Sequence, residues 1–259
     1  MRSRLFGLWC ALLLLSACHP PLQEIPLSEV PVGPLLQPLV QQRDSFRGMK
    51  AVARVEVQRK SRKRVYESVA ILEQSIHKLK VEGYGPLGSR LFALLWDGNA
   101  IQALRPGETE PYHVGSFGLE SMLGIAIAPQ DLCSILSGNI PAVPDDAEVT
   151  AGCASAGWCA VDVRGRDRRW KFRVRPTGGP HNGPRLEGVE LFSGDRPAFR
   201  SMFFYPPGVP SEQGTGPERI VVTDSDRGVS LLVLFEEADW NVPVDDGLFT
   251  LSFPEGNGR

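Results

Sequence analysis

Cysteine can form disulfides and bind metals, and five cysteines occur among the 259 residues of this sequence. Cys153 and Cys159 flank the segment ASAGW, which has the composition of a turn between two strands. Their thiols could be oxidised to a disulfide in an oxidising compartment. Cys133 lies among apolar residues and is expected to pack as a small hydrophobic side chain. A zinc site would need further ligands nearby in the sequence, and these are absent, so no metal is predicted.

The common catalytic motifs are absent from the sequence. It contains no G-x-S-x-G, no H-E-x-x-H and no phosphate-binding glycine loop. The four histidines are scattered at positions 19, 77, 113 and 181 and suit surface or edge sites. We therefore predict no catalytic residue, no cofactor and no enzyme activity. The net charge is −2 and the pI about 6.1, so the sequence lacks the excess of basic residues typical of nucleic-acid-binding proteins, and no nucleic-acid partner is expected.

The first residues predict export and a lipid anchor. Arg2 and Arg4 precede an apolar run over residues 5–15 that is too short to span a bilayer comfortably. This is the pattern of a signal peptide, here residues 1–17. The run ends in LSAC, which resembles the lipobox of bacterial lipoproteins and makes Cys18 the predicted lipidation site. The alternative is an ordinary signal peptide with a stray cysteine.

The residue after the predicted lipidation site bears on the destination. In enteric lipoproteins an aspartate at this position retains the protein in the inner membrane, and this sequence has His19. We therefore expect a protein anchored in the outer membrane and facing the periplasm. The prolines of residues 19–34 predict an extended tether over residues 18–34. Residues 35–259 are expected to form one domain, beginning with a short helix that Pro38 weakens.

Alternating apolar and polar residues predict strands from position 49 onward. Five segments separated by short gaps indicate antiparallel neighbours, and seven more follow after residue 157. The five are residues 49–58, 64–74, 76–83, 90–98 and 99–107; the seven are residues 158–165, 168–176, 185–194, 198–208, 218–226, 228–240 and 247–256. The predicted fold is mainly antiparallel β, a strongly curved sheet or barrel of about 11–12 strands.

Three local features depart from this strand pattern. Residues 116–141 predict two short helices, the second beginning at Pro129. The turn GPLG places Pro86 and Leu87 between two glycines, so an apolar side chain stands where a polar one is usual. Residues 59–64, RKSRKR, predict a basic hairpin tip. That tip is either a solvated turn or a contact for anionic headgroups or an acidic partner.

Residues 46–141 resemble the bacterial outer-membrane lipoprotein receptor LolB and its relatives. The matching segments occur in order: FRGMKAVARVEV, VEGYGPLGSRLFAL, GNAIQAL and PYHVGSFGLESMLGIAIAPQDLCSILSGNIP. The C-terminal VPVDDGLFTLSFPEG is similar to the closing strand of the related carrier LolA. The segment around residues 181–188 and the cysteine hairpin are not marks of that family.

The resemblance implies a half-open β-barrel with short lid helices, whose apolar interior holds the acyl chains of a lipoprotein in transit. It implies that Leu87, beside Pro86, projects into solvent and meets the membrane. The expected partners are membrane lipid, lipoprotein acyl chains and a periplasmic LolA-like carrier, with the protein itself a monomer. The candidate residues for the acyl cavity are Leu79, Val81, Leu119, Met122, Leu123, Leu132, Ile135 and Leu136.

Alternatives to cargo binding stay open from the sequence. A lipoprotein of this fold could serve as a structural or envelope-assembly partner without cargo, and a periplasmic hydrolase ranks lowest. The apolar stripes of the two predicted helices could fill a closed core instead of facing a cavity, and Leu87 could fold back onto the sheet. These stripes are Leu119, Met122 and Leu123 on the first helix and Leu132, Ile135 and Leu136 on the second. A void of several hundred Å³ beneath residues 116–137 would favour a receptor.

Overall fold

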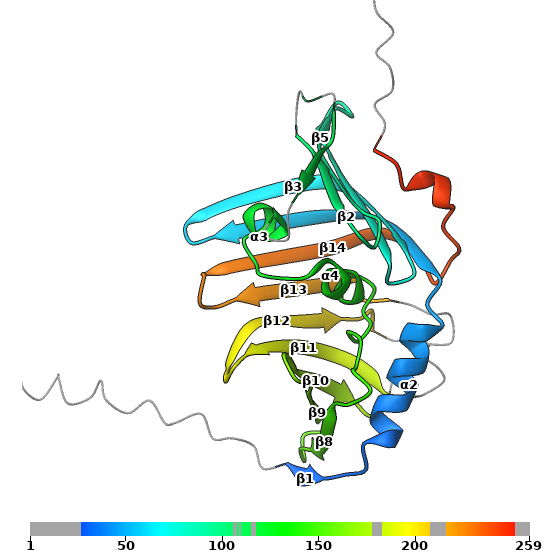
Figure 1. Cartoon of the computed structure of the whole chain (residues 1–259), viewed down its shortest axis with the longest axis vertical. Coiled ribbons are helices and arrows are strands. Elements are labelled where there is room, and N and C mark those ends of the chain that lie inside the picture. The colour runs from blue at the N-terminus through cyan, green and yellow to red at the C-terminus, as the bar shows by residue number, and fades with distance from the viewer. Residues whose placement is uncertain are drawn as a thin grey trace, which may run out of the picture.

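One large antiparallel sheet dominates the computed structural model, which describes residues 27–105, 108, 110–114, 118–177, 183–207 and 216–251 (Figure 1). The side chains of residues 118, 121 and 122 lie outside this description. The strands are β1 (Ser28–Glu29), β2 (Gly48–Arg59), β3 (Arg62–Gln74), β4 (Lys78–Tyr84), β5 (Arg90–Trp96), β6 (Ile101–Leu104), β7 (Tyr112–Val114), β8 (Glu148–Cys153), β9 (Cys159–Arg164), β10 (Arg169–Arg175), β11 (Arg185–Ser193), β12 (Arg196–Phe204), β13 (Arg219–Asp224) and β14 (Val229–Trp240).

The strand order explains how two halves of the chain share one sheet. Strands β2 to β7 form one meander and β8 to β14 another, and β14 pairs with β2 along its whole length. Within the described residues the sheet has 14 strands, and its edges are β1 and β7, so it stays open. The predicted mainly antiparallel, half-open fold is confirmed, with more strands than expected.

Side-chain alternation gives the sheet a buried face and an exposed face. On β10, Trp170, Phe172 and Val174 are buried while the arginines between and beside them are partly exposed or exposed. Phe199 on β12 packs edge-on against Trp170, with ring centroids 6.1 Å apart. Strand alternation places every second side chain on the same face, so these aromatic residues fill the concave side of the second half.

Short helices complete the concave side. They are α2 (Gly33–Asp44), α3 (Gly118–Leu123) and α4 (Pro129–Leu136). A 3₁₀ turn, η4 (Asp246–Leu248), lies against the other face of the sheet, where Lys80 of β4 donates to the Leu248 carbonyl (Nζ···O 3.2 Å). Helices α3 and α4 lie over the same face of the sheet (Figure 1). Pro129 begins α4, and Gly138 follows its end with a φ of +69°, a conformation that glycine adopts readily. In the described part of the chain, the helices are all too short or too polar to cross a membrane.

Several predicted boundaries need correction. The folded body begins upstream of residue 35, because Ser28 and Glu29 pair with β8 and α2 starts at Gly33. The strand predicted at residues 247–256 is wrong at its start, where Asp246–Leu248 form η4. The side chain of Asp245 accepts a hydrogen bond from the Gly247 amide (N···Oδ1 2.8 Å), which favours a turn. The signal peptide, Cys18 and the tether up to residue 26 lie outside the described residues.

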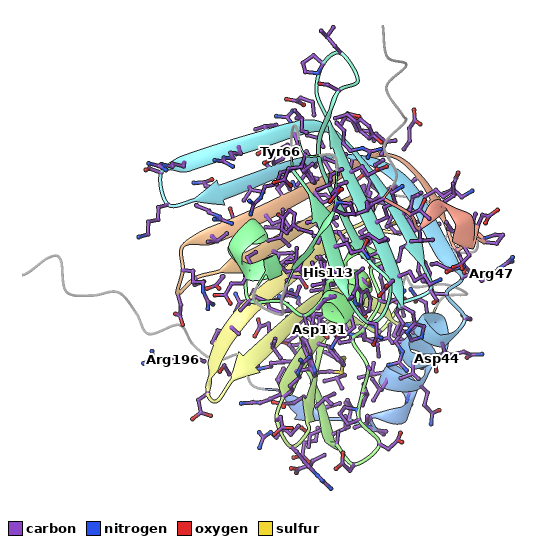
Figure 2. All side chains as sticks on the ribbon, turned by 45° about the horizontal axis from the view of Figure 1, so that its top comes forward. Asp44, Arg47, Tyr66, His113, Asp131 and Arg196 are labelled. Atoms are coloured by element: carbon purple, nitrogen blue, oxygen red, sulfur yellow. A yellow bond between two sulfur atoms is a disulfide. The ribbon has the colours of Figure 1, made fainter. Side chains whose placement is uncertain are left out.

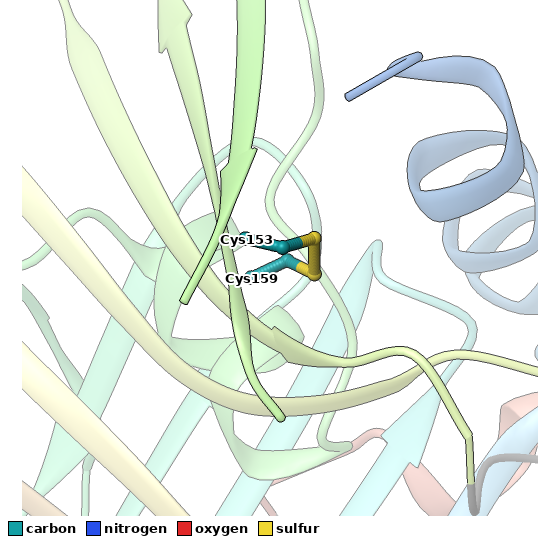
Figure 3. The surroundings of a disulfide bond; sticks show 2 residues. All are labelled: Cys153 and Cys159. Carbon is teal, nitrogen blue, oxygen red and sulfur yellow. A yellow bond between two sulfur atoms is a disulfide. The ribbon is translucent and has the colours of Figure 1, made fainter. Parts of the chain in front are cut away.

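A disulfide joins Cys153 at the end of β8 to Cys159 at the start of β9 (Figure 3). The two residues are directly opposite each other in the antiparallel pair, which brings their side chains to the same face. The bond closes the turn over residues 154–158 next to the point where β1 joins β8. Cys133 is a free thiol buried within α4.

Candidate functional site

A cavity of about 660 Å³ lies between the first half of the sheet and helices α3 and α4. Its lining is mostly aliphatic and aromatic, with four arginines. The lining residues are Val55, Val57, Arg59, Arg62, Arg64, Tyr66, Val69, Ile71, Val81, Leu91, Phe92, Leu104, Arg105, Tyr112, Leu123, Leu132, Leu136, Leu231 and Val233. The volume is within the range of about 300–1,000 Å³ usual for ligand sites.

Strand register assembles the cavity wall. Val55 of β2 is opposite Val233 of β14 on one side and Tyr66 of β3 on the other, so the three side chains share a face. A register shift between Ala53 and Val55 adds one residue to β3 at this point. Such a bulge changes which residues of a strand face inward. It lets Tyr66 face the cavity as Val69 does, although the two are three positions apart, an odd spacing that would otherwise put them on opposite faces. Figure 2 shows Tyr66 on this wall.

An aromatic pair closes part of the wall. The rings of Tyr66 and Phe92 meet edge-on with centroids 5.0 Å apart. Phe92 is opposite Gly83 in the β4–β5 pair, and a Cβ at Gly83 would lie 2.1 Å from the Phe92 ring. The glycine therefore leaves the space that the ring occupies.

Ion pairs hold the helices over the cavity. Asp131 at the start of α4 accepts a bond from Arg168 of the β9–β10 turn (Nη1···Oδ2 2.7 Å). Burial raises the pKa of the Asp131 carboxyl to about 6, and the Arg168 charge opposes this shift. Glu120 on α3 pairs with Arg227 of the β13–β14 turn (Oε1···Nη2 2.9 Å). Each of the two helices thus forms an ion pair with a turn in the second half of the sheet.

The fold can now be compared with known proteins. No family model matches the sequence, and no curated protein matches it. A LolA-superfamily protein from Nitrosomonas europaea aligns at a TM-score of 0.56 with 16% identity, over 83% of this chain and 96% of that one. The chain has a LolA-like fold.

Two further solved structures share this LolA-like fold. A DUF1329-family protein from Desulfovibrio piger aligns at a TM-score of 0.55 with 12% identity, over 84% of this chain and 98% of that one. A domain assigned to outer-membrane lipoprotein sorting, from Vibrio parahaemolyticus, aligns at 0.53 with 10% identity, over 82% and 94%. At these identities the likeness establishes the fold and leaves the activity to be argued from the site.

The structure places four of the eight cavity candidates in the cavity of this LolA-like fold. Val81, Leu123, Leu132 and Leu136 line it. The prediction is wrong for three others, whose side chains are packed in the core and do not line the cavity: Leu79, Leu119 and Ile135, at most 1% exposed. Met122 lies in α3, but its side chain is outside the described part.

Sequence reasoning missed the β14 contribution to the cavity. It identified the basic hairpin tip at residues 59–64, but not that three of its arginines line the cavity, nor that Arg105 does. Leu231 and Val233 come from β14, about 170 positions after β2 in the chain, and only the β14–β2 pairing brings them there. The segment was predicted as a strand, but its apolar run at residues 231–235 identifies neither the inward face nor the partner strand. The described residues contain no group of His, Cys, Asp and Glu side chains that could hold a metal ion.

The tip of the β4–β5 hairpin is a tight turn that presents Leu87 to solvent. The Gly85 amide donates to the Ser89 carbonyl (N···O 2.8 Å), and the Gly88 amide donates to the Gly85 carbonyl (2.9 Å). Gly88 has a φ of +75°, which a larger residue would resist. Leu87 is 97% exposed, so it does not fold back onto the sheet, and Pro86 is also exposed.

Glu73 is a buried carboxyl beyond the deep end of the cavity. It follows Val69 and Ile71 on the inner face of β3 and is 0% exposed. Burial raises the pKa of its carboxyl well above the ordinary 4.5, and the Ser137 hydroxyl opposes the shift. That hydroxyl, however, donates to the Cys133 carbonyl (Oγ···O 2.9 Å), and neither Glu73 oxygen has a hydrogen-bond partner among the described residues. We conclude that Glu73 is protonated in the folded protein.

Stability should therefore fall as the pH rises above 4.5, and Glu73→Gln should flatten this dependence. Unfolding exposes Glu73 and releases its proton, so its stabilising contribution is full below pH 4.5 and is lost as the pH rises toward its folded pKa. One such proton gives a slope of at most about 1.4 kcal/mol per pH unit. Urea unfolding of both proteins between pH 5 and pH 8 measures it.

Asp131 acts in the same direction up to its pKa of about 6, so the decisive comparison lies above that value. Asp131→Asn serves as the control, because it should alter the dependence only below this pH. Parallel curves for wild type and Glu73→Gln above pH 6.5 would show that Glu73 is ionised when folded.

Proposed function

We propose that this protein is an envelope lipoprotein that takes acyl chains into its cavity and delivers lipoproteins to the outer membrane, to which Cys18 anchors it. The observation that carries the proposal is the apolar cavity beneath α3 and α4, whose inner end is made by buried Val69, Ile71, Leu132 and Leu136. A scaffold without cargo has no use for such a void, because unfilled apolar volume costs stability.

The LolA-like fold supports this proposal, since one of the aligned structures belongs to a domain assigned to lipoprotein sorting. Within that fold, the lipobox at Cys18 and the GPLG turn favour a LolB-like receptor over a soluble carrier. A periplasmic LolA-like carrier would then supply the cargo. No catalytic step is required, because the acyl chains pass between apolar surfaces.

The exposed leucine gives the receptor a point of contact with the bilayer. Leu87 stands at the end of a stiff turn in which Pro86 fixes one backbone angle. Burial of one leucine side chain contributes about 1.5–3 kcal/mol. This is too little to anchor the protein, but it is enough to orient the body when the anchor already holds it close.

Leu87→Glu should leave folding intact and weaken membrane contact. The side chain is 97% exposed, so the change in unfolding free energy should stay within about 0.5 kcal/mol. Flotation of an unlipidated form with anionic liposomes should fall at least about tenfold, following the lost burial energy. Leu248→Glu is the matched control, since Leu248 is also exposed, at 42%, but lies in η4. Equal flotation of wild type and Leu87→Glu would remove the membrane-contact proposal.

The proposed function is tested by asking what the cavity carries and releases. A soluble form that begins after Cys18 is purified, and its bound lipid is extracted and identified by mass spectrometry. The same form is then loaded with a fluorescent triacylated lipopeptide and mixed with liposomes. We expect co-purified acyl lipid and transfer of the lipopeptide. A protein that carries no lipid and takes up no lipopeptide would instead be an envelope scaffold of this fold.

A further inference from the structure

Three arginines share the inner face of the β2–β3 hairpin at the exposed end of the cavity. Arg59 is directly opposite Arg62 in the register, and Arg64 is opposite Val57, so all three side chains are on the cavity side. Arg62 and Arg64 are exposed, whereas farther along β3 Tyr66 is half-buried and the lining residues after it are buried. The cavity therefore has an apolar closed end and a cationic open end.

A fourth arginine reaches the same opening from the other wall. Arg105 follows the end of β6, and its guanidinium stacks over the Tyr112 ring at 4.7 Å from the centroid. Both residues line the cavity. The backbone amide of Arg105 donates to a Glu108 carboxylate oxygen (N···Oε2 3.1 Å), while the Arg105 guanidinium stays over the Tyr112 ring.

The two faces of the β2–β3 hairpin differ in whether acidic residues accompany the basic ones. On the outer face, Glu56 pairs with Lys63 (Oε2···Nζ 2.6 Å) and with Arg54 (Oε1···Nη2 2.9 Å). On the inner face, none of the described residues that line the cavity is acidic. The charged residues among those that line the cavity are therefore all cationic, which favours an anion at this end.

The end of the α3 helix meets this cluster. Gly124, just after α3, has a φ of +79°, and a Cβ there would lie 2.7 Å from Arg59 Nε. Arg59 thus extends beneath the end of α3, at the boundary between the helix and the hairpin. An anion bound by the arginines would sit at the mouth of the cavity and not within its apolar part.

We infer that the arginine cluster of Arg59, Arg62, Arg64 and Arg105 binds the phosphate of an anionic diacyl lipid whose chains occupy the cavity. The inference rests on the proposed function, because it requires the cavity to hold acyl chains. The guanidinium group presents paired N–H donors that match two phosphate oxygens. An amphiphile with one charged end and one apolar end matches the two ends of this cavity. The cluster therefore favours an anionic phospholipid over an uncharged diacyl lipid, whereas the aliphatic wall accepts any acyl chain, including those of a lipoprotein.

The test compares two lipids that differ only in the headgroup. Fluorescent phosphatidylglycerol and a fluorescent diacylglycerol with the same chains are titrated into the soluble form. Wild type should bind phosphatidylglycerol more tightly, and added salt should weaken this binding. Arg62→Gln with Arg64→Gln should weaken phosphatidylglycerol binding by about tenfold or more and leave diacylglycerol binding unchanged, since charge-assisted hydrogen bonds are lost.

The matched control is Lys60→Gln with Lys63→Gln, which removes the same charge from the same hairpin without touching the cavity lining. It should bind both lipids as wild type does. Glycerol phosphate, which has no acyl chains, should not compete; competition would show a site for free phosphate instead. Equal binding of both lipids by wild type, or an equal loss of both in the arginine variant, overturns the headgroup inference alone. Failure of wild type to bind either lipid while it still takes up the lipopeptide also overturns the headgroup inference alone. Failure to bind either lipid and the lipopeptide overturns the proposed function itself.

Discussion

Val81→Trp is expected to empty the cavity of lipid while leaving the fold in place. Val81 is half-buried on β4 and lines the cavity, with Ile71 and Leu94 as its neighbours in the sheet. The larger side chain can enter a void of about 660 Å³ without displacing packed residues. Loss of contact with only two methylene groups, at about 0.8 kcal/mol each, lowers lipid affinity about tenfold. Mass spectrometry of lipid co-purified with the soluble form should then find about a tenth or less of the wild-type amount.

Val221→Trp is the matched control for the cavity-blocking variant. Val221 is half-buried on β13, between the buried Ile220 and Val222, and so points to the opposite face of the sheet. The same substitution there should leave the bound lipid unchanged. Both variants should melt within a few degrees of wild type. If Val81→Trp keeps its full complement of lipid and melts normally, the lipid is bound elsewhere.

Cys18→Ala is expected to move nearly all of the protein from the membrane fraction to the soluble fraction. The expectation follows from the lipobox that ends in Cys18. Acyl chains contribute about 0.8 kcal/mol per buried methylene, and two or more chains hold a protein stably. A single exposed leucine at the hairpin tip cannot replace them. Fractionation of cells, followed by detection of the protein in each fraction, measures the change.

Two controls make the anchoring test specific. Cys10→Ala alters a cysteine of the same leader and should leave fractionation unchanged, because Cys10 is expected to leave with the signal peptide. A form whose residues 1–18 are replaced by a cleavable leader without cysteine should be soluble and keep its circular-dichroism spectrum. Retention of that form in the membrane fraction would mean that the folded body, not Cys18, holds the protein there.

Local sequence patterns predicted most of the elements because these patterns reflect local physics. Period-two alternation identified the long strands, and a proline at the start with a glycine after the end delimited α4. The turn around Leu87 was predictable because Gly85 and Gly88 allow the backbone angles of a tight turn, including the positive φ of Gly88, and Pro86 fixes one angle. The pairing of Cys153 with Cys159 is found in the structure and needed only a turn between two strands.

The candidate site was less predictable because it depends on contacts between distant segments. Leu79 and Val81 lie on the same face of β4, yet Leu79 is buried in the core and Val81 lines the cavity. No property of either residue distinguishes them; the position of α4, which contacts β4, does. Short strands were also missed, since β1 and β7 have two and three residues and too little alternation to detect.

The pairing of β14 with β2 has a consequence for how the chain acquires its structure. A chain that emerges with its N-terminus first completes β2 to β7 while one edge of β2 still lacks its partner, which lies about 170 residues later. That edge offers unpaired amides and carbonyls beside an apolar face, which favours aggregation. Contacts of such long sequence separation also form slowly. We therefore expect folding to be completed only after synthesis ends, and the half-finished sheet to be the species that most needs a chaperone.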